Sequence, residues 1–342
     1  MLASVAPVDQ LDYVSRFPHA TIFHHPLWMD LLADCYGYRP DFLALQDGNG
    51  SVSVGLPVMR VSDPFGGRRA IALPFSDFCA PLGAANESTL SAFVRALEQW
   101  RIQNHLAQVQ VRWPLPPQNG VFAHGAFLQH LTPLTGNPSE VFRTFRKTQV
   151  QRHIRQAERL GVTTHWGVSR DDLSSFYGLH IRTRRRLGVP VQPKRFFQLL
   201  WERLIQRGMG FILLAYQKEQ LLAGALFLHL NKTLSYKFGA SVPEHWKLRP
   251  NDLIFWHAIQ WGCRNGYQIL DWGRTDLDND GLRDFKRGWG SKEETLHYSV
   301  LADEPPRPEA SARGRDALRF FIQHSPPWVC REMGELFYRY AA

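Results

Sequence analysis

Cysteine is scarce in this chain of 342 residues, which contains four, at positions 35, 79, 263 and 330. They are widely scattered, no two form a Cys-x-x-Cys pair, and no histidine stands beside them at metal-ligand spacing. This excludes a thioredoxin-type redox motif, a zinc-ribbon motif and a disulfide framework. We expect buried free thiols in a reducing compartment, and therefore a cytoplasmic protein.

Long hydrophobic runs are also missing. No stretch of about 18 uninterrupted apolar residues occurs, which excludes a helix that spans a membrane. The first residues have neither a basic region nor a long apolar core, so we expect no secretory signal. No Gly-x-Ser-x-Gly elbow occurs either, and the 14 histidines are expected to be structural.

Acidic residues are outnumbered, with 31 Asp and Glu against 40 Lys and Arg, which leaves a net charge of +9. This balance favours anionic partners such as nucleic acid, nucleotides, phosphosugars or an anionic membrane surface. The hydrophobic share of 44% is ordinary for a globular protein. The length predicts about two domains.

One pattern occurs twice along the chain. The first copy is a hairpin over 42–46 and 51–58 with an Asp-Gly-Asn-Gly turn, then a helix over 88–103 and a strand over 107–113. The second copy is a hairpin over 211–217 and 221–228, a strand over 233–239, a helix over 251–265 and a strand over 267–272. Both return strands carry an early glycine, Gly55 or Gly224, which indicates a bulge or a close backbone approach. Duplication is favoured over chance, although hairpin, helix and strand is a common order.

Basic helices follow the first copy. We expect one helix over 139–160, a second over 171–187 and a third over 194–206. A tail from 313 onward is expected to form two short helices that Pro326 and Pro327 separate. The predicted domains are 1–136, 137–301, and a connector and tail over 302–342. The basic residues of these helices either bind a polyanion or form a solvated helix face. The candidates for polyanion or donor binding are Arg143, Arg146, Lys147 and Arg185.

The most informative stretch begins at Tyr267. A buried strand is expected to end in Asp271, Arg274 and Asp276, and a short segment beyond it presents Lys286 between Phe285 and Trp289. Loops beyond strand ends are where α/β proteins place their chemistry. A pairing of Asp271 with Arg274 for structural reasons alone stays open. The alternate aspartates 276, 278 and 280 lack the terminal glutamate of a calcium loop, so no metal site is expected.

The order of these motifs resembles the FemAB-like branch of the GNAT acyltransferase superfamily, over roughly residues 20–301. The resemblance rests on the opening segment 22–28, on Gly55-Leu-Pro57 and Leu73-Pro-Phe75, and on motifs of the second half. Those of the second half are Arg146, Lys147, Arg185, Gly188, Pro190, Phe196, Phe197, Asp271, Gly273, Arg274, Phe285, Lys286 and Gly290. The resemblance implies an α+β or α/β fold of two tandem GNAT-like domains, with mixed, mostly antiparallel sheets flanked by helices and related by duplication.

The resemblance implies transfer of an acyl or aminoacyl group to an amine. No cofactor is expected to be tightly bound, and the acyl donor is a co-substrate, either aminoacyl-tRNA or acyl-CoA. Two features differ from familiar relatives: the long helical arm of the staphylococcal-type members is missing, and the usual pyrophosphate loop is replaced by the segment 245–252. The free amides at the start of the helix that begins at Asn251 can still bind phosphate.

Acyl transfer needs a neutral amine and a group that stabilises the oxyanion. Lys286 is the candidate for charge stabilisation, with a surface lysine as the alternative. Asp276 is the candidate base, and Tyr236 is placed to bond the acyl carbonyl, although a strand aromatic is often a core residue. The expected substrate-binding residues are Arg274, Asp271, Lys237, Trp289, Phe285 and Asp77.

Our main hypothesis is a cytoplasmic acyl- or aminoacyltransferase that forms an amide on an amino group of a cell-envelope or polysaccharide precursor. We expect an acceptor that is phosphorylated or nucleotide-linked, tRNA as a candidate partner, and no transmembrane segment. The first alternative is an acyl-CoA-dependent N-acetyltransferase that acts on a small amine or amino sugar. The second is a non-catalytic adaptor that binds RNA or another polyanion. The sequence names neither the acyl group nor the acceptor.

Overall fold

The computed structural model describes residues 2–4, 7–62, 67–83, 86–306 and 312–340. The chain forms two compact units. The first comprises Met1–Leu128, Thr295–Glu309 and Arg339–Ala342, and the second comprises Gln129–Glu294 and Ala310–Tyr338. Strands β6 (Val121–Pro133) and β12 (Lys292–Ala302) each begin in one unit and end in the other. The domain ranges 1–136, 137–301 and 302–342 stay a prediction.

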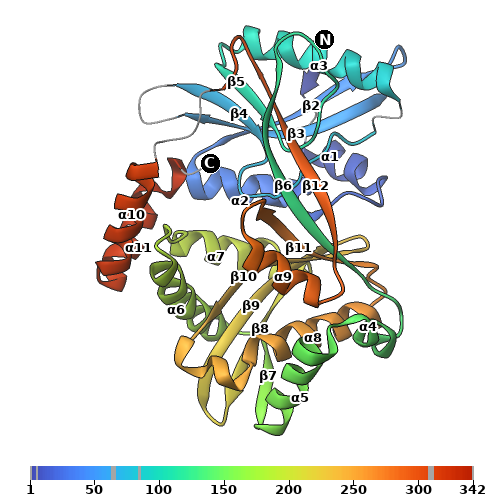
Figure 1. Ribbon diagram of the computed structural model, residues 1–342. Coiled ribbons are helices and arrows are strands. Elements are labelled where there is room, and N and C mark those ends of the chain that lie inside the picture. The colour runs from blue at the N-terminus through green and yellow to red at the C-terminus, as the bar shows by residue number, and fades with distance from the viewer. Residues whose placement is uncertain (1, 5–6, 63–66, 84–85, 307–311, 341–342) are drawn as a thin grey trace. The chain divides into compact units, whose positions relative to one another are not determined.

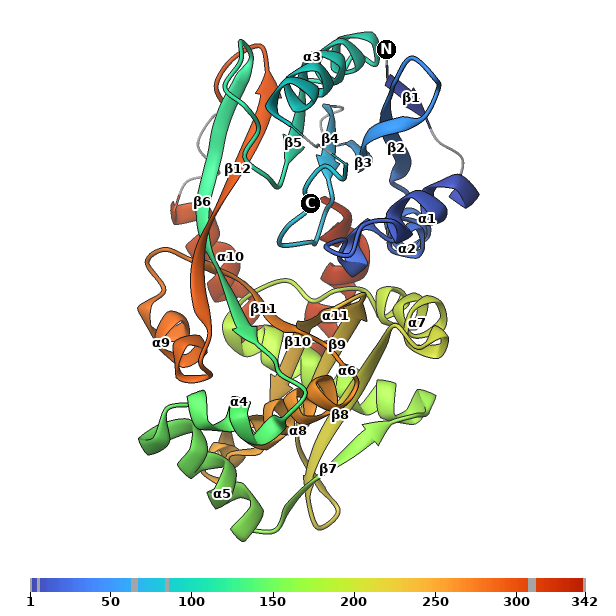
Figure 2. The same cartoon turned by 90° about the vertical axis from the view of Figure 1, so that its right-hand side faces the viewer.

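The first unit is a mixed sheet with helices on both sides. Its strands pair in the order β1-β2-β3-β4-β5-β12, and only β4 and β5 run parallel. Figure 2 shows β2–β5 between α3 and the pair α1 and α2. The elements are β1 (Leu2–Ser4), α1 (Pro7–Ser15), η1 (Ile22–His24), α2 (Pro26–Tyr36), β2 (Arg39–Gln46), β3 (Val52–Ser62), β4 (Arg68–Ala72), α3 (Glu87–Gln103) and β5 (Gln108–Val111).

The second unit repeats this arrangement. Its strands pair in the order β11-β10-β9-β8-β7, and only β10 and β11 run parallel. The elements are α4 (Pro138–Thr144), η2 (Lys147–Gln151), α5 (Arg152–Arg159), β7 (Val162–Gly167), α6 (Arg170–Leu187), α7 (Lys194–Arg203), η3 (Ile205–Arg207), β8 (Gly210–Gln217), β9 (Gln220–Leu230), β10 (Thr233–Ser241), η4 (Pro243–Leu248), α8 (Pro250–Arg264), β11 (Ile269–Asp276) and α9 (Asp280–Gly288).

The two units therefore share an antiparallel hairpin, a third antiparallel strand, a helix and a parallel strand. These are β2-β3-β4-α3-β5 in the first unit and β8-β9-β10-α8-β11 in the second. The predicted fold, two tandem GNAT-like domains with mixed and mostly antiparallel sheets, is confirmed.

Helices α6 and α8 pack on opposite faces of the second sheet (Figure 1). On the α8 face, Phe211 and Phe227 contact Trp261 and Phe255 with ring centroids 4.6 and 6.3 Å apart. On the α6 face, a Cβ at Gly224 would lie 2.9 Å from the ring of Phe176. A Cβ at Gly55 of the first unit would likewise meet aromatic rings at 2.6 Å. The close approach that was predicted at both glycines is confirmed.

The prediction of one helix over 139–160 is wrong in one respect, because the helix is interrupted. Phe145 and Arg146 have extended ψ angles of 148° and 115°, which end α4 before the η2 turn and α5 begin. The Arg146 amide donates to the Gly288 carbonyl, and Gln151 Nε2 donates to the carbonyls of Phe142 and Phe145. Hydrogen bonds to the Gly288 carbonyl and from the Gln151 side chain thus replace the backbone hydrogen bonds of a continuous helix. The pattern of residue types along the sequence does not predict this outcome.

The tail forms two helices, α10 (Ala312–His324) and α11 (Pro327–Phe337), which Pro326 separates from each other. Both contact α6, where Arg185 Nε donates to the Ser325 carbonyl at 2.6 Å. The two predicted tail helices are confirmed. No helix of the described residues is long and apolar enough to cross a membrane.

The four cysteines all lie in the described part of the chain, and none forms a disulfide. Three are buried, as predicted, whereas Cys35 is partly exposed. Burial raises the pKa of the Cys79 thiol to about 12, so this thiol stays protonated at neutral pH.

Two helical glycines of the second unit allow a test of how the tail is held. A Cβ at Gly334 of α11 would overlap the Val191 carbonyl oxygen, whereas a Cβ at Gly178 of α6 meets nothing within 4 Å. We expect Gly334→Ala to destabilise the docking of α11 by about 1–3 kcal/mol, and Gly178→Ala to stabilise the protein by about 0.4–1 kcal/mol. Urea unfolding together with hydrogen exchange of the α11 amides measures both. Equal protection of α11 in the two variants contradicts the expectation.

Candidate active site

Strands β10 and β11 separate at the centre of the second unit. They pair over only three residues, Thr233–Ser235 against Ile269–Asp271, although β10 continues to Ser241 and β11 to Asp276. The pairing of β10 with β9 is irregular between Tyr236 and Phe238, where β10 bends. Residues of both strands beyond the last pair line a cavity.

The cavity has a volume of about 550 Å³, within the range of about 300–1,000 Å³ typical of ligand pockets. Strand β10, the N-terminus of α8, helix α9 and the η4 turn form its walls. The lining residues are Thr183, Arg186, Gly224, Ala225, Tyr236, Gly239, Ala240, Ser241, Trp246, Arg249, Pro250, Asn251, Asp252, Phe255, Trp272, Leu282, Phe285 and Lys286.

Aromatic side chains form one wall of this cavity. The Tyr236 ring contacts Phe255 and Trp272 with centroids 4.9 and 6.2 Å apart, and Trp272 contacts Phe285 at 6.1 Å. Burial raises the pKa of Tyr236 to about 12, so its hydroxyl remains a proton donor at neutral pH. A Cβ at Gly239 would overlap that hydroxyl, so the absence of a side chain at position 239 makes room for it.

Lys286 is 3% exposed and lies in the cavity wall. Its Nζ donates to the carbonyl oxygens of Gly273 and Arg274 at 2.9 and 3.2 Å. Gly273 has a φ of +72°, a conformation that glycine adopts without strain, and its amide donates to Asp271 Oδ1 at 2.8 Å. The Asp-x-Gly-Arg motif therefore kinks β11, and the carbonyls at the kink hold the ammonium group.

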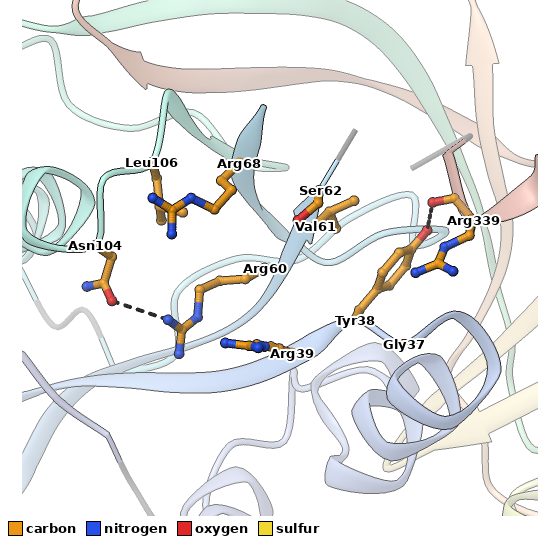
Figure 3. Close-up of a pocket in the computed structure, with 10 residues that line it drawn as sticks. All are labelled: Gly37, Tyr38, Arg39, Arg60, Val61, Ser62, Arg68, Asn104, Leu106 and Arg339. Carbon is orange, nitrogen blue, oxygen red and sulfur yellow. Dashed lines mark hydrogen bonds between the residues drawn. The ribbon is translucent and has the colours of Figure 1, made fainter. Parts of the chain in front are cut away.

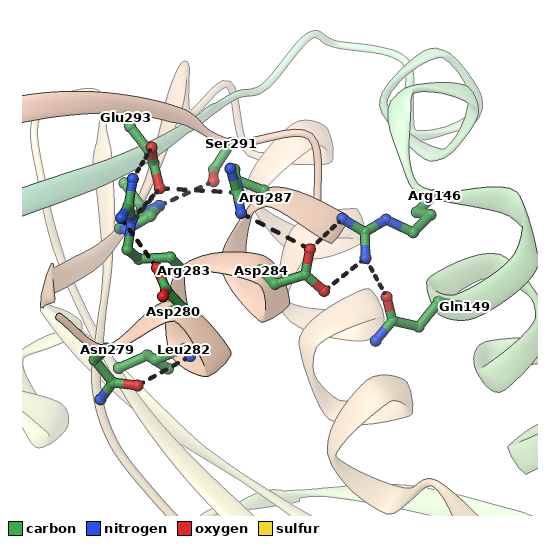
Figure 4. A network of polar contacts seen from close by, with 11 residues as sticks. Arg146, Gln149, Asn279, Asp280, Leu282, Arg283, Asp284, Arg287, Ser291 and Glu293 are labelled. Carbon is green, nitrogen blue, oxygen red and sulfur yellow. Dashed lines mark hydrogen bonds and ion pairs between the residues drawn. The ribbon is translucent and has the colours of Figure 1, made fainter. Parts of the chain in front are cut away.

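Helix α9, which carries Lys286, is fixed by a network of ions (Figure 4). Arg146 binds both carboxylate oxygens of Asp284 at 2.8 Å. Arg283 binds Glu293 at 3.2 and 3.3 Å, and the Asn279 side chain caps the helix. Each exposed pair contributes little free energy, but together they fix the position of α9 on both sides.

The opposite end of the cavity is basic. The Arg186 guanidinium lies over the Trp246 ring, 4.9 Å from its centroid. Arg249 precedes α8 with a φ of +60°, and its Nε is buried without a hydrogen-bond partner among the described residues. None of the described side chains caps the N-terminus of α8. Two guanidinium groups and a helix N-terminus favour an anionic ligand group here.

Asp252 is the carboxylate in the cavity wall. Burial raises its pKa to about 6, although Arg249 acts in the opposite direction. His153 Nδ1 lies 3.5 Å from its Oδ1, and burial lowers the pKa of this histidine. At neutral pH the pair is therefore an ionised carboxylate beside a neutral imidazole.

The structure brings four of the predicted site residues into this cavity, namely Tyr236, Asn251, Phe285 and Lys286. Two more support it from behind. Trp289 is fully buried and its ring centroid lies 5.5 Å from that of Trp272, and Asp271 accepts bonds from the Gly273 amide and from Gln129.

Other predicted residues do not line the cavity. Arg274 and Asp276 are exposed at the end of β11, and the Lys237 ammonium lies 5.7 Å from the centroid of the Phe238 ring. Asp77 belongs to the first unit, where its carbonyl accepts from Tyr298. Arg143 lines a different cavity of about 420 Å³, Lys147 is exposed on η2, and Arg185 bonds the tail.

Fourteen of the 18 lining residues were not predicted as site residues, among them Trp246, Arg249 and Asp252. The signal for these three was Pro250, because proline at the first helical position marks the helix start around which all three lie. The left-handed conformation of Arg249 leaves no trace in the sequence.

Residues 144–287 match the family model described as an acetyltransferase (GNAT) domain. No curated protein matches the chain. The matched region contains strands β7 to β11 of the second unit's sheet and every residue that lines the cavity.

Solved structures extend the likeness to the whole fold. FemX is 15% identical with a TM-score of 0.69, covering 87% of this chain and 96% of FemX. L-PGS from Bacillus licheniformis is 13% identical with a TM-score of 0.51, covering 86% of this chain and 90% of that one. A tandem GNAT protein from the clavulanic acid biosynthesis pathway is 10% identical with a TM-score of 0.52, and the match covers 90% of this chain and 99% of that one. The predicted resemblance to the FemAB-like branch is confirmed in the fold.

The raised pKa of Asp252 predicts a pH-dependent stability. Between about pH 4 and pH 6 the folded protein keeps a proton that the unfolded chain has released. The stability from this group is thus full below about pH 4 and is lost as the pH rises through 6. We expect Asp252→Asn to remove this decline and to stabilise the protein at neutral pH by up to about 3 kcal/mol.

Urea unfolding of both proteins across this pH range measures the difference. Asp278→Asn, at an exposed aspartate, is the matched control and should leave the profile of the unmodified protein unchanged. A decline of the same size in Asp252→Asn contradicts the expectation.

Proposed function

We propose that this protein is an acyl- or aminoacyltransferase that forms an amide on an amino group of a cell-envelope or polysaccharide precursor. One observation carries the proposal: the cavity where β10 and β11 separate joins a buried ammonium, a protonated phenol and a carboxylate. These are the groups that transfer of an acyl group to an amine requires.

In the proposed reaction the activated acyl carbonyl lies against the aromatic wall. The lone pair of the acceptor amine attacks the carbonyl carbon, and negative charge develops on the carbonyl oxygen. The Tyr236 hydroxyl donates a hydrogen bond to this oxygen, and the Lys286 charge stabilises it in a partly dry site. The C–N bond forms, the bond to the donor's oxygen or sulfur breaks, and a carboxylate accepts the amine proton.

Asp252 is better placed for that proton than Asp276, the residue chosen from the sequence. Asp252 lines the cavity, whereas Asp276 is exposed at the end of β11. A carboxylate with a pKa of about 6 is ionised at neutral pH and holds a proton more readily than an ordinary aspartate. We therefore propose Asp252 as the base.

The charges at the cavity mouth support a donor that carries phosphate. Arg186, Arg249 and the uncapped start of α8, at Asn251, form the basic end. Both aminoacyl-tRNA and acyl-CoA carry phosphate, so these charges suit either donor. A CoA-dependent N-acetyltransferase is the second candidate, and the match to an acetyltransferase model favours it.

The proposal predicts the effect of removing the buried charge. Lys286→Met keeps the side-chain length, and we expect kcat to fall about a hundredfold or more, because charge stabilisation in the transition state is lost. Lys286→Arg, which keeps the charge, should retain more activity. Steady-state kinetics with the donor identified below measures both variants.

Lys292→Met serves as the control, since this lysine is exposed at the start of β12. Circular dichroism and thermal melting check that each variant folds. If folded Lys286→Met turns over as fast as the control, Lys286 has no catalytic role. If it also leaves steeply salt-dependent binding of tRNA intact, the chain is a non-catalytic adaptor.

The donor can be identified directly by native mass spectrometry of the protein incubated with an acyl-CoA mixture and, separately, with aminoacyl-tRNA. We expect one donor to give a complex that is weakened tenfold or more in Arg186→Gln/Arg249→Gln, because the basic end of the cavity is lost. Arg152→Gln/Arg159→Gln, at two exposed arginines of α5, is the matched control. Binding of neither donor, or equal weakening in both double variants, contradicts the proposal.

A further inference from the structure

A second basic pocket lies in the first unit, where nothing in the proposed reaction requires it. Its volume is about 240 Å³, below the range of about 300–1,000 Å³ of pockets for drug-sized ligands. Figure 3 shows its lining side chains. They are Gly37, Tyr38, Arg39, Arg60, Val61, Ser62, Arg68, Asn104, Leu106 and Arg339.

The strand register puts three of these arginines on one face of the sheet. Arg39 of β2 stands directly opposite Arg60 of β3. Arg60 stands opposite Ala70 of β4, and Arg68 is two residues from Ala70, so it shares this face and is the diagonal neighbour of Arg60. In Figure 3 the three guanidinium groups point into the same part of the pocket.

Such an arrangement has an energetic cost when the pocket is empty. Like charges directly opposite on neighbouring strands destabilise a sheet by a few tenths to about 1 kcal/mol. Asp41 offsets one of the three charges, because Arg60 binds its two carboxylate oxygens at 2.6 and 3.1 Å. Within the described residues no carboxylate pairs with Arg39 or Arg68, so two of these three charges remain uncompensated, and Arg339 adds another positive charge to the lining.

The remaining walls suit a small polar group. Asn104 Oδ1 accepts from Arg60 Nη1 at 3.2 Å, which fixes the direction of this guanidinium (Figure 3). The Tyr38 hydroxyl bonds the Arg339 carbonyl and so holds the chain end beside the pocket. Val61 and Leu106 are buried beneath it and exclude water from its base.

We propose that this pocket binds the phosphate group of a small phosphorylated ligand. A dianion matches the two uncompensated charges, and guanidinium groups bind phosphate oxygens through paired hydrogen bonds. The volume accommodates a phosphate or diphosphate group with part of a sugar. The proposal rests on the first unit alone and stands whether or not the second unit is a transferase.

Isothermal titration with inorganic pyrophosphate at fixed ionic strength tests the pocket. The test variant is Arg39→Gln/Arg68→Gln, which spares the Arg60–Asp41 pair. The matched control is Arg16→Gln/Arg95→Gln, which removes the same charge from exposed arginines of the same unit. We expect the test variant to lose affinity tenfold or more and the control to stay within twofold of the unmodified protein.

Two further measurements distinguish the alternatives. Pyrophosphate can also bind at the basic end of the second unit's cavity, so Arg186→Gln separates the two sites. The binding event that Arg39→Gln/Arg68→Gln removes should persist in Arg186→Gln; if Arg186→Gln abolishes that same event, the proposed pocket is wrong. Equal losses of pyrophosphate affinity in the test and control variants also overturn the proposal, because binding then depends only on the net charge of the protein. Displacement of pyrophosphate by glucose 1-phosphate supports a phosphorylated ligand, and failure to displace it means that the pocket takes inorganic anions only.

Discussion

The hydrogen bonds from the Lys286 ammonium to the carbonyls of Gly273 and Arg274 join helix α9 to strand β11. A charge that is 97% removed from solvent contact is costly unless polar groups surround it. The kink at Gly273 supplies these groups, because a regular strand would direct its carbonyls into the ladder. The Asp271 carboxylate holds the kink through the Gly273 amide. The wall of the cavity depends on this one arrangement.

The two units show how one copy of a repeated fold acquires a cavity between its parallel strands. In the first unit the parallel pair β4 and β5 stays together along the whole of β5. In the second unit β10 and β11 part after three residue pairs, and both strands continue. Backbone groups at such an opening are available to a ligand, and the aromatic residues beside it exclude water. The same order of elements thus gives a continuous parallel pair in one unit and a separated parallel pair with a cavity beside it in the other.

Local patterns predicted much of this fold. The Asp-Gly-Asn-Gly turn, the alternating apolar strands and the proline and glycine that bracket α8 predicted both hairpins, α3, α8 and the strands β5, β10 and β11 within a few residues. Strands β6, β7 and β12 were not predicted. The predictions failed where distant groups intervened. The helix that was expected over 139–160 breaks at Phe145 because Gly288 and Gln151 offer bonds to its backbone. Asp276 was the candidate base because it stands at a strand end, but in the structure it is exposed to solvent away from the cavity.

The sequence alone indicated the repeat and much of the element order, and it singled out Lys286 as a candidate site residue, because these follow from periodicity, turn chemistry and local motifs. Tertiary structure alone decided which side chains meet in one cavity. Arg186 belongs to α6, whereas Arg249 and Asp252 lie at the start of α8, and folding brings them to one cavity. The cluster of three arginines in the first unit could not be predicted from the sequence either, because positions 39, 60 and 68 become neighbours only through strand register. Strand register is set by pairing between segments of the chain, and the sequence of one segment alone does not determine it.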